Sequence, residues 1–173
     1  MTRRLSLIIS WGATALLIVI PCAALVLLVQ LPWFAELAKQ NLRLPIYWQT
    51  VTDTQLYALW GLTALYLSIG LFGLYFLRRA FGSFAKGDLF NAANSKDLKR
   101  FSMLLLAHAI ATPVHIALTS VLLSLNHPPG EKMLSIAFGS NELRAIGVGL
   151  VLWVMSNLLV EGTKLKAENR QFV

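Results

Sequence analysis

The sequence predicts an all-α integral membrane protein with four transmembrane helices arranged as two tandem helix pairs. Hydrophobic residues make up 57% of the chain and charged residues 13%, whereas a typical soluble domain carries roughly 25% charged residues. The apolar residues gather in four runs that contain no Asp or Glu, and most of the basic residues gather between alternate runs. These observations predict one membrane domain over residues 1–173.

The four apolar runs define the expected spans. Residues 5–31, 56–77 and 101–125 each exceed the roughly 20 residues that cross a bilayer as a helix, and none of them carries a formal charge. The fourth span, residues 143–160, is shorter and contains Arg144 near its start. It can cross if its flanking charges extend toward the interface or if the bilayer thins locally.

Two segments between the spans suit the membrane surface. Residues 32–55 open with an amphipathic, aromatic stretch at 33–39, and we prefer a lid on the interface over a ligand site. Residues 126–142 begin with a Pro- and Gly-containing turn, and their apolar piece 133–138 is expected to lie on the interface.

The distribution of basic residues predicts the orientation. Of the 15 Lys and Arg residues, 11 lie in the first four residues, in segment 78–100 and in the tail 161–173. The positive-inside rule therefore places both termini, the segment and the tail in the cytoplasm. The net charge of +7 does not indicate direct nucleic-acid binding, because the charges cluster at the ends of apolar runs, where they meet lipid headgroups.

A pattern in segment 78–100 recurs in the tail. When Gly87 is aligned with Gly162, a glycine, an apolar residue, an asparagine and a second apolar residue recur at offsets 0, 3, 7 and 11, which is one helical face. Any amphipathic helix beside a membrane can show this spacing, but we prefer a duplicated unit of two helices and a cytoplasmic turn. The predicted partner-binding residues are Lys86, Gly87, Phe90, Asn94, Leu98, Gly162, Leu165, Glu168 and Asn169.

The third run has the most polar intramembrane face, formed by His108, Thr112, His115 and Thr119. It indicates either neutral histidines hydrogen-bonded inside the bundle or a functional cavity. The two histidines lie about 10 Å apart along one helix, so they cannot ligate one metal ion in an unbroken helix. No metal site is predicted.

Catalytic motifs are missing from the sequence. Its one cysteine, Cys22, lies inside an apolar run, so neither a disulfide framework nor paired-thiol chemistry is predicted. No nucleophile and base, phosphate loop or carboxylate pair occurs at a usable spacing. We therefore expect no enzyme activity and no cofactor.

The motif residues resemble those of a known family. Gly87, Phe90 and Asn94 precede Leu98 and Arg100, and the closing stretch contains Glu161, Gly162, Leu165, Glu168 and Asn169. In this the chain is similar to the small bacterial four-helix inner-membrane proteins catalogued as domain of unknown function 2975. The resemblance implies a multi-pass protein of the bacterial inner membrane without an established activity, often encoded beside a small helix-turn-helix regulator.

These observations lead to a functional hypothesis. We expect a non-enzymatic membrane regulator or anchor whose cytoplasmic segments bind a small soluble partner such as a helix-turn-helix transcription factor. The alternatives are a small transporter or channel subunit that uses the His/Thr face, for which a homodimer would be needed, and a toxin-immunity protein.

Overall fold

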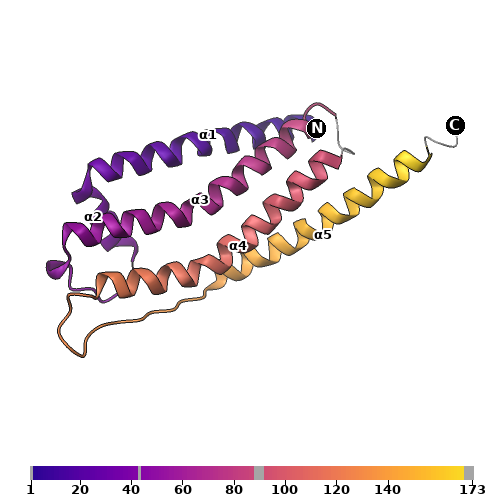
Figure 1. Cartoon of the computed structure of the whole chain (residues 1–173). Helices are drawn as coiled ribbons and strands as arrows, with labels where there is room; N and C mark the ends of the chain where they lie inside the picture. The colour runs from indigo at the N-terminus through magenta and orange to yellow at the C-terminus, as the bar shows by residue number, and fades with distance from the viewer. Residues whose placement is uncertain (1, 43, 88–91, 170–173) are drawn as a thin grey trace.

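A computed structural model shows an all-helical chain (Figure 1). It describes residues 2–42, 44–87 and 92–169, and the side chains of residues 3–42, 44–87 and 93–163. The described elements are α1 (Thr2–Val29), α2 (Leu31–Asn41), the short helix η1 (Trp48–Thr50), α3 (Asp53–Phe84), α4 (Ala92–Leu123) and α5 (Ser140–Asn169). Within these ranges there is no strand.

Four of these helices, α1, α3, α4 and α5, are long and apolar enough to cross a membrane. The predicted all-α architecture with four helices capable of spanning a membrane is therefore confirmed. The extensive contacts join α1 to α3, α3 to α4, and α4 to α5, so the four helices form a row (Figure 1). In such a row α1 and α5 each pack mainly against one long helix.

The helices extend beyond the apolar runs that predicted them. Segment 78–100, which was expected to be a distinct polar segment, is largely a continuation of α3 and α4. Polar residues can continue a helix outside the bilayer, because the backbone hydrogen bonds of a helix do not require apolar side chains. The described part of the turn ends at Gly87, whose φ of +93° lies in the left-handed region that favours glycine.

Apolar and polar side chains are distributed as expected for a protein in lipid. Large apolar side chains such as Val29 and Leu65 are 80% and 70% exposed. By contrast, the largest fully buried side chains are mostly hydroxyl residues: Leu123, Thr119, Ser95, Ser102, Ser120, Ser124 and Ser156. Small residues allow close helix contact, and lipid accepts the apolar exterior.

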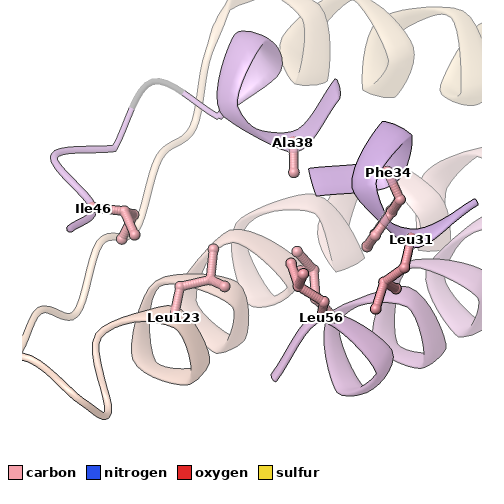
Figure 2. Close-up of a cluster of buried hydrophobic side chains, with 7 residues drawn as sticks. Leu31, Phe34, Ala38, Ile46, Leu56 and Leu123 are labelled. Atoms are coloured by element: carbon pink, nitrogen blue, oxygen red, sulfur yellow. The ribbon is translucent and has the colours of Figure 1, made fainter. Parts of the chain in front are cut away.

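One end of the row, opposite the chain's N-terminus, is covered by α2 and the neighbouring loops; we call it the loop end. The apolar face of α2, formed by Leu31, Phe34 and Ala38, packs onto Leu56 of α3 and Leu123 of α4 (Figure 2). The amphipathic stretch thus buries its apolar face against protein, while other residues such as Trp33 remain exposed.

The segment before α5 lies along α4 in an extended conformation. The Ser124 hydroxyl accepts a hydrogen bond from Met133 N, 3.0 Å, and the Ser120 hydroxyl accepts one from Ser135 N, 2.8 Å. Ser120 and Ser124 are fully buried, so these serines tie the segment to α4. The apolar piece 133–138 therefore follows α4 instead of lying only on the interface.

This arrangement displaces α5 along α4. Gly149, the tenth residue of α5, lies against Ser102 and Leu106 of α4. Ser102 in turn lies ten residues after the first residue of α4. The 20 residues of α5 that follow Gly149 cover about 30 Å, twice the remaining length of α4. The far end of α5 therefore projects beyond the start of α4, as Figure 1 shows.

Candidate functional site

The end of the row that holds the chain's N-terminus, the end of α3 and the start of α4 is its most basic described region; we call it the basic end. Here three helices line an open cavity of about 460 Å³. It is lined by Ser10 of α1, by Tyr75, Arg78, Arg79, Gly82, Ser83 and Lys86 of α3 and the turn after it, and by Ala93, Asn94 and Asp97 of α4. We call it the basic-end cavity.

A carboxylate forms part of the cavity wall. Asp97 is 3% exposed, and its carboxylate lies 3.0 Å from the Arg79 Nε and 3.7 Å from an Arg100 amino group. Both guanidinium groups also lie over aromatic rings, Arg79 over Tyr75 and Arg100 over Phe76. Because a buried charge is costly unless it is paired, Asp97 holds the ends of α3 and α4 together.

Small residues bring α1 close to α3 beside the cavity. The Ser10 hydroxyl donates to the Arg78 carbonyl at 3.3 Å. A side chain at Gly82 would place its Cβ 3.4 Å from the Ser10 oxygen. A methyl group at position 82 would therefore make an ordinary van der Waals contact with Ser10, so α1 and α3 lie close together at this wall of the cavity.

The structure brings only part of the predicted partner-binding set together. Lys86 and Asn94 both line the basic-end cavity. Lys86 and Gly87 are exposed, whereas Asn94 and Leu98 are buried at 4% and 6% exposure. Phe90 lies outside the described residues.

The second copy of the pattern adopts a different conformation from the first. Gly162 lies inside α5, whereas Gly87 lies in a turn. The cytoplasmic turn that the duplicated unit predicted at Gly162 is therefore not formed, because the helix continues through this residue to Asn169. The side chains of Leu165, Glu168 and Asn169 lie outside the described set, although their backbone is helical.

The predicted His/Thr face packs against α3. The Tyr66 ring stacks between the imidazoles of His108 and His115, with centroid distances of 4.3 and 4.6 Å. Its hydroxyl is 3.0 Å from the Thr112 hydroxyl, and Thr63 bonds to His115 at 3.3 Å. Polar side chains of the two helices thus satisfy one another, while His108 Nδ1 and the Thr119 hydroxyl are buried without a hydrogen-bond partner among the described residues.

A hydrogen-bond network at the loop end was not foreseen from the sequence. The buried Gln55 amide donates to the Leu122 carbonyl at 2.7 Å and accepts from Asn126 at 2.8 Å. It also forms a capping box with Thr52 at the start of α3. The Thr52-x-x-Gln55 spacing was a usable signal for this helix start.

A second cavity, of about 750 Å³, opens at the loop end between η1 and the loop after α4. His127 accepts a hydrogen bond from Tyr47 N at 3.1 Å and its ring packs on the Tyr47 ring. A hydrogen bond between the Tyr47 hydroxyl and Glu131, together with the negative charge of Glu131, raises the pKa of Tyr47.

The comparisons with known proteins identify the family. Among the described side chains, no group of three or more His, Cys, Asp or Glu residues is placed to hold a metal ion. No curated protein and no solved structure matches the chain. The family described as "Protein of unknown function (DUF2975)" matches residues 38–172. The match covers most of the chain, from α2 to the C-terminal tail, and the chain therefore belongs to the DUF2975 family.

Proposed function

We propose that the protein is a non-enzymatic regulator or anchor of the bacterial inner membrane that holds a small soluble protein, such as a helix-turn-helix transcription factor, at its basic end. The observation that carries this proposal is the projection of α5, which passes the start of α4 by about 15 Å. A helix end that stands clear of its own bundle is available to a partner.

The orientation in this proposal follows from charge. The basic end carries Arg78, Arg79, Lys86 and Arg100 together with the basic residues near both termini. Basic residues beside membrane spans are retained on the cytoplasmic side. Both termini, and any partner bound beside them, would then be cytoplasmic.

We infer the contact surface for the partner from the burial of the predicted residues. Asn94 and Leu98 are buried, so they support the surface from within. Lys86 and Gly87 are exposed, and α5 carries residues 162–169 past the bundle. We therefore propose contact through Lys86, Gly87 and this part of α5, with an acidic surface on the partner to complement the basic charge.

The transporter alternative receives less support from the geometry. A conducting face would have to border an open path, yet Tyr66 fills the space between His108 and His115. The ring-to-ring packing and the hydroxyl contacts account for these polar residues as the joint between α3 and α4. No specific observation favours a toxin-immunity role.

Site-specific photo-crosslinking in cells tests the proposal. A photo-reactive residue at position 165, on the projecting part of α5, should capture a small helix-turn-helix protein. The matched control is position 49, which is exposed at the loop end and should capture no cytoplasmic protein. Asn169→Ala should reduce the yield at position 165 several-fold without changing membrane insertion, because it removes an amide that the proposal assigns to the partner.

Two results would contradict the proposal. One is equal capture of the same protein from positions 165 and 49, since that would show indiscriminate contact. The other is the absence of any soluble product at position 165 when crosslinks to neighbouring membrane proteins form normally.

A further inference from the structure

Two cavities adjoin along the seam between α1 and α3, and they differ in chemistry. The basic-end cavity is polar and lined by cationic residues. Next to it lies a groove of about 440 Å³ whose lining is almost wholly apolar: Leu17, Ser68, Leu71, Phe72, Tyr75 and Phe76. Tyr75 belongs to both.

We propose that this seam is a binding site for one anionic phospholipid, with the phosphate in the basic-end cavity and an acyl chain in the apolar groove. The site is separate from the projecting end of α5 and does not depend on a soluble partner.

The charges in the cavity favour a phosphate. Its lining contains three cations, Arg78, Arg79 and Lys86, and one carboxylate, Asp97. Arg79 is paired with Asp97, which Arg100 also approaches, so the carboxylate is already compensated. Among the described ion pairs none involves Arg78 or Lys86, and these two remain available to an anion.

The cavity also supplies neutral hydrogen-bonding groups. The hydroxyls of Ser10 of α1 and Ser83 of α3 line it. Asn94 of α4 forms part of the wall but is more than nine-tenths buried, and we assign it no contact with the ligand. Basic pockets between transmembrane helices at the cytoplasmic side are suited to lipid headgroups.

The apolar groove favours a lipid over free phosphate. On α1, Ser10 lines the polar cavity and Leu17 lines the groove, a separation of about 10 Å along the helix. On α3 the order is the same, with residues 78–86 beside the polar cavity and residues 68–76 beside the groove. Along both helices the lining therefore changes from charged to apolar toward the membrane interior. A phospholipid changes in the same order, from its headgroup to its acyl chains.

Native mass spectrometry of the full chain, purified in mild detergent, tests the site. Phosphatidylglycerol, phosphatidylcholine and inorganic phosphate are the three probes. We expect one phosphatidylglycerol retained per chain, in preference to phosphatidylcholine, and no comparable stabilisation by inorganic phosphate in a thermal unfolding assay.

Charge variants locate the headgroup. Arg78→Gln with Lys86→Gln should weaken phosphatidylglycerol binding about tenfold or more, because each basic residue near the headgroup contributes to affinity. The matched control, Lys96→Gln with Lys99→Gln, removes the same charge from the same end outside the cavity lining and should bind normally. Equal losses in the two double variants would overturn the proposal, since they would show diffuse attraction.

A groove variant separates lipid from free phosphate and changes no charge. Ser68→Phe fills the apolar groove and should weaken phosphatidylglycerol binding while leaving any effect of inorganic phosphate unchanged. If Ser68→Phe binds phosphatidylglycerol as the wild type does, or if phosphatidylcholine is retained equally, the assignment of a specific anionic lipid is overturned. Stabilisation by inorganic phosphate equal to that by phosphatidylglycerol would also overturn it, in favour of a small-anion site.

Discussion

At the scale of single residues, the basic end depends on one buried carboxylate. Asp97 approaches two arginines from different elements, Arg79 of α3 and Arg100 of α4, but at unequal distances of 3.0 and 3.7 Å. The Asp97 side chain is 5% exposed, whereas those of the arginines are 48% and 56% exposed. Removing either arginine therefore leaves the buried Asp97 carboxylate less well compensated. The loss of stability should be larger for Arg79, which is the nearer of the two.

This asymmetry gives a prediction. Arg79→Gln should lower the free energy of unfolding, because it leaves the buried Asp97 carboxylate with its more distant partner. Arg100→Gln should cost less than Arg79→Gln, since the Arg100 pair is longer at 3.7 Å and the Arg100 side chain is 56% exposed. Chemical denaturation in lipid-free detergent would measure both, with Arg78→Gln, which forms no described ion pair, as the control. Equal costs for all three variants would show that the Asp97 pairing contributes little.

At the scale of elements, the contact between α4 and α5 depends on a glycine. A Cβ added at Gly149 would lie 2.8 Å from a Leu106 side-chain atom and 3.5 Å from the Ser102 carbonyl. Two residues earlier, Gly147 has nothing within 4 Å. Gly149 therefore lies against α4, whereas Gly147 lies on an open side of α5.

A matched pair of substitutions tests this contact. Gly149→Ile should destabilise the chain by about 1–3 kcal/mol, because a branched side chain has to displace Leu106 and push α5 from α4. Gly147→Ile adds the same atoms on the open side and should have little effect. Thermal unfolding followed by tryptophan fluorescence compares the two variants. A similar midpoint for both would mean that α5 does not pack on α4 through this face.

At the scale of the whole molecule, the row of helices separates a basic end from a loop end. The basic end holds Lys86, and the loop end holds Gln49, beside the cavity that Tyr47 and Glu131 line. Both Lys86 and Gln49 are exposed. They are suitable reporters for the two sides of the membrane.

Cysteine labelling would establish the orientation. In a Cys22→Ala background, Gln49→Cys should react with a membrane-impermeant maleimide added to intact spheroplasts, because the loop end should face the periplasm. Lys86→Cys should react only after the membrane is permeabilised. The reverse pattern would place the basic end outside and contradict the cytoplasmic partner.

Much of the architecture could be predicted from the sequence because hydropathy is a local property. The runs around residues 5–31, 56–77 and 101–125 each mark a helix, since lipid requires every backbone group to be bonded within its own segment. The family could also be predicted, from residues on either side of the third run, and the match over residues 38–172 confirms it. The ends of the helices were harder to predict from the sequence, because polar residues continue a helix outside the bilayer without any hydropathy signal.

The candidate sites depended on the tertiary structure. The sequence showed that the charges of segment 78–100 lie near one another, but not that Asp97 is buried beside Arg79, that Tyr66 separates His108 from His115, or that Gly162 is helical. Hydropathy determined which segments enter the membrane. The rotation and displacement of one helix against another depend on contacts between residues distant in sequence, and those contacts decided which polar groups meet and where cavities form.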